Sequence, residues 1–252
     1  MSYITKEIAI SAIRRLKQYE NAQKDIHETW GLNFREDTGR RNALLSRAQE
    51  KFFAQELTKS GTKATDNGKT GQPDIIIEKS GTELECKLTS GSGGSWSLQA
   101  DYSTLKRKKS QDFLYVLADE NFESFAVLYF DQLDIDDFHN PAPGSRQKAR
   151  MNKSKAMKKC KVLVGEVSSK NENMINSYAI KFQDIISKSL EKVEKTNRII
   201  SEITAPKKIN TLEAGRDRFI KSMNKKLSDI AKKKDYWIST PSQFSISLER
   251  IL

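Results

Sequence analysis

Apolar residues in the N-terminal part recur at the helical period, with Lys, Arg and Glu between them. The apolar positions are Ile8, Ile13, Leu16 and Tyr19 in residues 5–28, and Leu44, Leu45, Ala48, Phe52 and Leu57 in residues 40–58. Lys59-Ser60-Gly61 ends the second pattern. The sequence therefore predicts two amphipathic helices, each with one face towards a core.

The pattern changes to strands further along the chain. Residues 62–71 are polar and glycine-rich, which is typical of a loop or a weak strand. Three isoleucines follow Asp74, and residues 83–88 alternate between charged and apolar side chains. Because Ser80-Gly81 between them is a turn signal, we expect a β-hairpin over residues 73–88.

The rest of the chain repeats both patterns. Further strands are expected at 113–118, 125–130, 161–165 and 244–248, and further helices at 97–109, 183–203 and 211–233. This order predicts a mixed α/β (α+β) fold, with a central mixed β-sheet flanked by helices and helical additions at both ends. We expect one domain over residues 1–252, with its core at about 40–168 and a mostly helical region at 183–252.

Charge narrows the class of partner. The chain has 44 Lys and Arg against 33 Asp and Glu, a formal net charge of +11. Such a field attracts polyanions, so nucleic acid is the first candidate partner and an anionic membrane surface the second. Cys86 and Cys160 are the only cysteines, and His27 and His139 the only histidines. A disulfide framework, a zinc site and histidine-based catalysis are therefore not expected.

The sequence shows neither a signal peptide nor a membrane span, and this indicates the compartment. Residues 1–13 contain early charges and no signal-peptide apolar core. No stretch approaches the ~18 apolar residues of a membrane span. We expect a cytoplasmic protein.

The predicted hairpin brings charged residues together. If Ser80 and Gly81 are the two central turn residues, position 74 faces 87, and opposed residues point to the same side. Glu85 shares that side with Lys87 because the strand period is two. Asp74, Glu85 and Lys87 then converge, while Cys86 points to the core. A three-residue turn would instead direct Asp74 away.

Two carboxylates and a lysine on one face suit a hard divalent cation such as Mg²⁺. A Glu-x-Lys triplet is common in a chain rich in both residues, so the solvated face of an edge hairpin is the alternative. Pro73, the isoleucine run and the glycine turn favour a site, because a charged Asp74 at the mouth of a buried strand is costly unless it is paired.

These residues resemble a known motif. Pro73-Asp74, followed by Glu85-Cys86-Lys87, is similar to the motif of the PD-(D/E)XK nuclease superfamily, to which many type II restriction endonucleases belong. The resemblance covers roughly residues 40–130. It implies a restriction-endonuclease-like αβββαβ core with the motif on its second and third strands.

The resemblance also implies roles for individual residues. Asp74 and Glu85 would bind Mg²⁺, or Mn²⁺ in its place, with the Cys86 carbonyl as a further metal ligand, and Lys87 would act on the attacking water. A glutamate on the preceding helix often assists; Glu50 is the candidate and Glu56 the alternative. Gln99 would position water or phosphate, whereas Tyr102 is interpreted as structural.

A basic segment at 143–153 is the main DNA-binding candidate. It carries four cations and no acid. Arg, Asn and Gln read base edges, whereas Lys contacts phosphate. The candidate residues are Ser145, Arg146, Gln147, Lys148, Arg150, Asn152 and Lys153.

The leading hypothesis is therefore a Mg²⁺-dependent endodeoxyribonuclease that cleaves double-stranded DNA at a specific sequence. Cutting both strands of a symmetric site is simplest for a homodimer, and the C-terminal helical region would supply a dimer contact or a DNA clamp. A companion DNA methyltransferase is implied by the resemblance only. The alternatives are a structure-specific or repair nuclease of the same fold and a non-catalytic DNA-binding protein.

Overall fold

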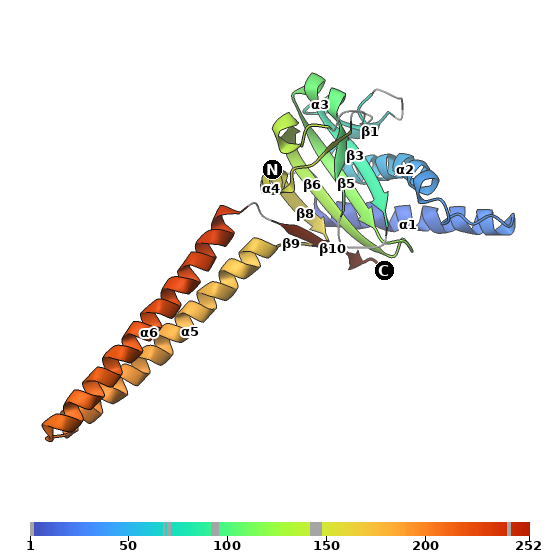
Figure 1. Cartoon of the computed structure of the whole chain (residues 1–252). Coiled ribbons are helices and arrows are strands. Elements are labelled where there is room, and N and C mark those ends of the chain that lie inside the picture. Colours follow the sequence, from blue (N-terminus) through green and yellow to red (C-terminus); the bar gives the residue numbers. More distant parts are fainter. Residues whose placement is uncertain (1–2, 68, 70–71, 92–95, 142–147, 241–242) are drawn as a thin grey trace. The chain divides into compact units, whose positions relative to one another are not determined.

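The computed structural model describes residues 3–67, 69, 72–91, 96–141, 148–240 and 243–252 (Figure 1). The chain divides into two compact units. The first combines Met1–Val167 with Phe244–Leu252, and the second is Ser168–Gln243.

Seven of the described strands form one mixed sheet in the first unit, in the order β1-β2-β3-β5-β6-β11, with β8 also paired to β6. The strands are β1 Ala64–Asp66, β2 Ile75–Ile77, β3 Thr82–Ser90, β5 Ser110–Ala118, β6 Ser124–Asp134, β8 Cys160–Val164 and β11 Glu249–Arg250. The β3–β5 pair is parallel, whereas the other pairs in this sheet are antiparallel. The prediction of a central mixed sheet is confirmed.

Two helices, α1 (Lys6–Thr29) and α2 (Thr38–Lys59), cover one face of this sheet (Figure 1). Their apolar stripes pack with alternate residues of the strands, such as Leu84, Leu114 and Val116. Predicted helix residues in this core are Ile8, Ile13, Leu16, Leu45, Ala48 and Leu57, with Tyr19 and Phe52 packed against it. Leu44 is the exception at 40 % exposure.

The opposite face of β5 belongs to a second apolar cluster, which contains Phe113, Tyr115 and Leu117. This face is covered by short elements: β4 Gln99–Asp101, α3 Tyr102–Lys108, η1 Ile135–Asp137, β7 Lys148–Arg150, α4 Lys153–Ala156 and η2 Met157–Lys159. Burial on both faces explains why β5 reads as a continuous apolar run.

The predicted helix at 97–109 is wrong in its first half. Leu98 and Ala100 are buried while Asp101 is exposed, so this stretch has the period of a strand, and β4 pairs antiparallel with β7. Asp101 then caps α3, because its side chain accepts a hydrogen bond from the Thr104 amide at 2.7 Å. The pairing of residues 99–101 with the distant strand β7 therefore outweighs the local preference for a helix.

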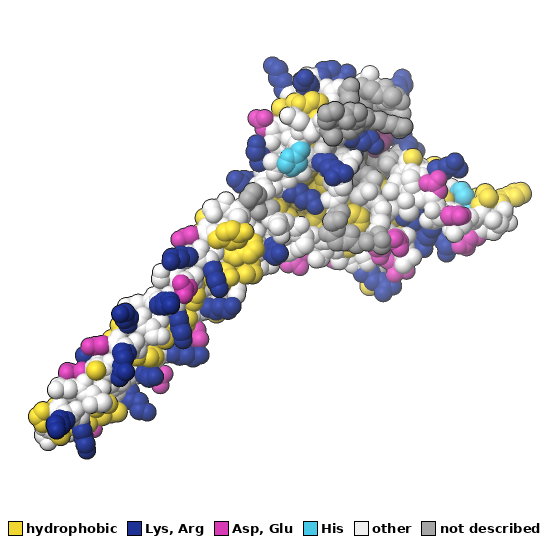
Figure 2. All heavy atoms as spheres, in the orientation of Figure 1, with side chains coloured by type: hydrophobic (Ala, Val, Ile, Leu, Met, Phe, Trp, Pro, Cys, Tyr) yellow, Lys and Arg dark blue, Asp and Glu magenta, His cyan; other side chains and the backbone are white. Residues whose placement is uncertain are grey.

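The second unit is a helical hairpin of α5 (Lys170–Glu202) and α6 (Pro206–Ser239), which lie side by side (Figure 1). Both helices extend well beyond the predicted 183–203 and 211–233. The Asn171 side chain joins the two ends of the hairpin by donating to the carbonyl oxygens of Trp237 and Thr240, both at 3.1 Å. Lys and Arg side chains recur along the hairpin surface (Figure 2).

Two strands flank this hairpin in sequence. They are β9 Glu166–Ser169 and β10 Phe244–Ser247, and the second confirms the strand expected at 244–248. Of the helices in the described ranges, none combines the length and apolar character needed to cross a membrane.

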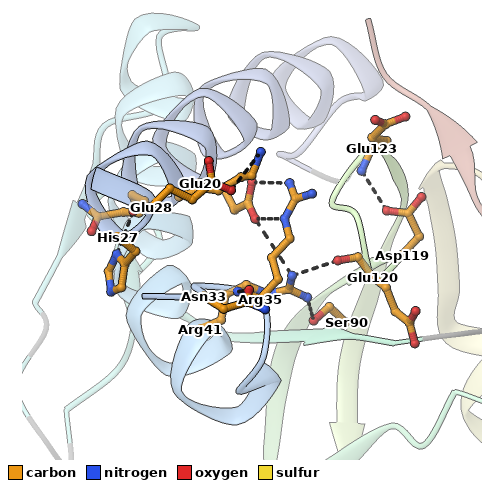
Figure 3. A network of polar contacts seen from close by, with 12 residues as sticks. Glu20, His27, Glu28, Asn33, Arg35, Arg41, Ser90, Asp119, Glu120 and Glu123 are labelled. Carbon is orange, nitrogen blue, oxygen red and sulfur yellow. Dashed lines mark hydrogen bonds and ion pairs between the residues drawn. The ribbon is translucent and has the colours of Figure 1, made fainter. Parts of the chain in front are cut away.

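A buried polar network holds the end of β3 in place (Figure 3). Arg41, which is 1 % exposed, donates to the Ser90 hydroxyl at 2.6 Å and to the Glu120 carbonyl at 2.8 Å. Arg35 donates through two nitrogens to the carboxylate of Glu20, each at 2.9 Å. The network ties α1 and α2 to the strand that carries the Glu85-Cys86-Lys87 motif.

Candidate active site

The hairpin that carries the motif has a different turn from the predicted one. Ile75 pairs with Leu84 and Ile77 with Thr82, so four residues, 78–81, form the loop in place of a two-residue Ser80-Gly81 turn. The Gly81 amide donates to the Ile77 carbonyl at 2.8 Å, and Gly81 has a φ of +66°. The pairing is displaced by two positions from the predicted one. Because the side-chain period is also two, every residue keeps its predicted face.

Asp74, Glu85 and Lys87 therefore meet as the sequence predicts. The Cys86 amide donates to Asp74 Oδ2 at 2.7 Å, and Lys87 Nζ lies 2.5 Å from Glu85 Oε1. Cys86 itself is 6 % exposed and belongs to the core beneath α1 and α2. The expected division of β3 into a charged and a core-facing side is confirmed.

The electrostatics of Asp74 reflect this crowding. Burial, followed by the negative charge of Glu85, raises the pKa of Asp74 to about 6, against the opposing effects of the Cys86 amide and Lys87. Burial lowers the pKa of Lys87, but the carboxylates of Glu85 and Asp74 outweigh it, so the pKa of Lys87 is raised overall. Lys87 is thus held as an ammonium beside two carboxyl groups that repel each other.

Glu50 and Glu56 differ in their surroundings. Glu50 contributes to the raised pKa of Asp74, so it lies within electrostatic reach of the motif, and its carboxylate accepts from Arg47 at 2.7 Å. Glu56 instead accepts from Ser11 at 2.8 Å and from Arg15 at 2.9 Å. Glu56 joins α2 to α1, and Glu50 is the glutamate on the side of the motif.

The β4–β7 ribbon brings part of the basic segment to the motif. Lys87, Gln99, Asp101 and Lys148 line one pocket of about 360 Å³. Gln99 stands on the strand β4, where its side chain donates to the Ser97 hydroxyl at 3.0 Å. Lys148, separated from Lys87 by 61 positions in the sequence, therefore shares a surface with it.

The other DNA-binding candidates are placed unevenly. Lys148 and Arg150 are exposed on β7, on either side of the buried Ala149. Asn152 stands at the N-cap of α4, and burial lowers the pKa of Lys153. Ser145, Arg146 and Gln147 lie outside the described residues.

Two buried glutamines that the sequence did not single out contact the motif strand. Gln111, 3 % exposed on β5, donates to Glu85 Oε2 at 3.3 Å. Gln49, 0 % exposed on α2, donates to the Lys87 carbonyl at 3.4 Å. The side-chain oxygen of each is buried without a hydrogen-bond partner. A polar residue inside an otherwise apolar helix or strand pattern is the signal that would have identified them.

A divalent cation such as Mg²⁺ needs several oxygen donors around it. Among the residues that the structure describes, no group of three or more His, Cys, Asp and Glu side chains is placed to hold a metal ion. Asp74 and Glu85 form a pair, and Mg²⁺ commonly uses one or two carboxylates with waters and substrate phosphate. Burial and then the repulsion from Glu85 raise the pKa of Asp74, and a bound cation would relieve that repulsion.

Comparison with known proteins identifies no relative, since no family model, curated protein or solved structure matches the chain.

Proposed function

We propose that this chain is a Mg²⁺-dependent endodeoxyribonuclease of the type II restriction endonuclease kind, within the PD-(D/E)XK superfamily. The observation that carries the proposal is the meeting of Asp74, Glu85 and Lys87 on one side of the β2–β3 hairpin. A partly buried carboxyl pair beside an ammonium is costly in a purely structural role. The pair lies next to the β4–β7 ribbon, whose Lys148 shares a pocket with Lys87, and such cations attract a polyanion such as DNA.

The order of elements supports the same proposal. The helix α2 is followed by β1, β2 and β3, then by the short strand β4, α3 and β5, with Asp74 directly before β2 and Glu85 and Lys87 on β3. Apart from β4, which pairs with β7 outside the main sheet, this is the αβββαβ order that the resemblance implies.

Each motif residue has a task in phosphodiester hydrolysis. Asp74 and Glu85 would hold Mg²⁺, with the Cys86 carbonyl as a further oxygen ligand. The bound ion supplies Lewis-acid chemistry, in that it lowers the pKa of water and offsets charge on the phosphate. Lys87 orients the attacking water and stabilises negative charge in the transition state through its ammonium.

Gln111 and the ribbon complete the site. Gln111 fixes the orientation of Glu85 from the neighbouring parallel strand. Lys148 and Arg150 contact the DNA backbone or base edges next to Lys87, and a homodimer would present two such sites to the two strands.

The test is incubation of supercoiled plasmid DNA with the protein and Mg²⁺. We expect discrete linear fragments, with no cutting in EDTA. Lys87→Ala should abolish cutting while DNA binding persists. Lys108→Ala is the matched control. Lys108 of α3 pairs at 2.6 Å with Glu83, which is on β3 like Lys87 but outside the motif. This variant should cut DNA normally.

Three outcomes would contradict the proposal. Undiminished cutting by Lys87→Ala removes the assigned site. Binding without scission in Mg²⁺ or Mn²⁺ favours a non-catalytic DNA-binding protein. Cutting of branched DNA but not of linear duplex favours a structure-specific or repair nuclease.

A further inference from the structure

Charge is unevenly distributed between the two helices of the hairpin. The helix α6 carries ten Lys and Arg against four Asp and Glu, whereas α5, of nearly the same length, carries six against five. A hairpin that needed charge only for solubility would not require this asymmetry. The excess on α6 therefore indicates a surface with its own partner.

The helical period gathers five of these cations into one line. Lys207, Arg218, Lys221, Lys225 and Lys232 fall within an arc of about 60° on α6. They are all exposed, and the line, called here the α6 stripe, contains no Asp or Glu. The stripe lies opposite the half-buried seam of the hairpin, which includes Ile209, Leu212, Phe219, Met223, Leu227 and Ile230.

Within the described part of the hairpin, Arg218 Nε donates to the Ala214 carbonyl at 3.2 Å, and the other interactions do not use the stripe cations. Lys192 lies 4.3 Å from the centre of the Phe219 ring, and Arg216 donates to the Asn197 side chain at 3.0 Å. The ion pairs found in the described part of this unit involve Lys188 and Arg216, and neither belongs to the stripe. The stripe residues are therefore available to an external anion.

Like charges within the stripe work against the stability of α6, although Asp217 and Asp229 lie four residues from Lys221 and Lys225 and offset part of this effect. Arg218, Lys221 and Lys225 are spaced by three and four residues, and like charges at that spacing destabilise a helix. Lys207 lies in the first turn of α6, where the helix dipole favours an acid, and that turn has none. Such an arrangement becomes favourable when a polyanion lies along the helix.

We propose that the α6 stripe binds the phosphate backbone of duplex DNA, as a surface separate from the ribbon beside Lys87. The stripe from Lys207 to Lys232 is about 37 Å long at the rise of an α-helix. That length is close to the ~34 Å of one turn of B-DNA, so the cations reach phosphates on both edges of a groove. The inference rests on the proposed function for its choice of DNA as partner.

The experiment compares two triple variants of the full chain. Arg218→Gln, Lys221→Gln and Lys225→Gln remove three charges from the stripe. Lys208→Gln, Lys226→Gln and Lys233→Gln remove three from a line about a quarter turn away on the same helix. Binding to a fluorescent 30-base-pair duplex is measured in EDTA over a range of salt concentrations, and circular dichroism checks that both variants keep their helices.

We expect the stripe variant to bind at least about tenfold more weakly at 100 mM salt, and its log–log salt slope to fall by about 2 to 3. The flank variant should show a much smaller change. Equal effects of the two variants would overturn the inference, because net charge alone would then explain binding. It would also be overturned if the stripe were needed for binding to phosphatidylserine vesicles but not to DNA.

The outcomes separate this inference from the proposed function. If plasmid is cut while the two variants bind alike, the stripe is wrong and the nuclease proposal stands. If binding depends on the stripe but no plasmid is cut, the DNA surface stands and the nuclease proposal fails.

Discussion

Asp74 Oδ2 accepts a hydrogen bond from the amide of Cys86, 2.7 Å away, across the β2–β3 hairpin. This bond holds the carboxyl group of Asp74 beside the strand that carries Glu85 and Lys87. Burial at this position, followed by the negative charge of Glu85, raises its pKa to about 6. Position and charge are therefore coupled at this residue, and both are measurable.

The raised pKa makes Asp74 a source of instability in the metal-free protein. The folded-state pKa lies above the ordinary value of 3.8. The contribution of Asp74 to the free energy of unfolding is therefore complete below about pH 4 and is lost as the pH rises through 6. Asn at position 74 cannot ionise. The free energy of unfolding of Asp74→Asn, relative to that of wild type, should therefore rise by up to about 3 kcal/mol between pH 4 and pH 8. Urea unfolding in EDTA at both pH values tests this, and an equal difference at both would contradict it.

The same pKa predicts how protons compete with Mg²⁺. Ligand carboxyl groups must be ionised, so the affinity for Mg²⁺ should be nearly constant above about pH 6.5 and should fall by up to about tenfold for each pH unit below 6. Titration of Mg²⁺ against plasmid cleavage between pH 5 and 8 gives the half-saturating concentration. A half-saturating concentration that does not change with pH would exclude Asp74 as a ligand.

Gln111 is predicted to position Glu85. Gln111→Met removes the donor to Glu85 Oε2 while keeping a side chain of similar length, and a loss of about 10- to 100-fold in Mg²⁺ affinity or cleavage rate is expected. Gln132→Met is the control, because Gln132 donates to Asp112 and not to the motif. It should leave the Mg²⁺ dependence unchanged; equal shifts in the two variants would assign Gln111 a structural role only.

The pair of the buried Glu20 and the partly exposed Arg35 is predicted to support the fold of the first unit. Glu20 is fully buried and also lies 3.9 Å from the buried Arg41, so Glu20→Gln leaves Arg41 and the partly exposed Arg35 without this carboxylate and should cost about 3–5 kcal/mol. Glu28→Gln breaks the exposed pair with Lys24 on the same helix and should cost less than about 1 kcal/mol. Urea unfolding measures both, and similar values would show that burial is not what matters here.

Two glycines should respond to alanine with opposite signs. A Cβ at Gly165, where φ is +78°, would lie 2.5 Å from the Ser247 carbonyl oxygen and 3.0 Å from Ala126 Cβ. We expect Gly165→Ala to destabilise the first unit by about 2–4 kcal/mol. Gly215→Ala lies in α6, where a Cβ has no neighbour within 4 Å, and should stabilise the hairpin by about 0.5–1 kcal/mol. Thermal melts of the two variants check the signs.

The sequence alone determined which side of the hairpin each motif residue occupies. Side chains alternate along a strand whatever it pairs with. Asp74, Glu85 and Lys87 therefore lie on the same side of the hairpin, although its register differs by two positions from the predicted one. The isoleucine run and the apolar run of β5 likewise marked buried strands. These features depend on local backbone geometry, which neighbouring residues encode.

Tertiary structure decided which distant residues join the motif. The parallel register of β3 and β5 places Gln111 near Glu85, and the packing of α2 selects Glu50 over Glu56. The pairing of β4 with β7 brings Lys148 to Lys87 and converts an expected helix into a strand. Such contacts are set by the free energy of long-range pairing and burial, and the local sequence pattern does not specify the partner.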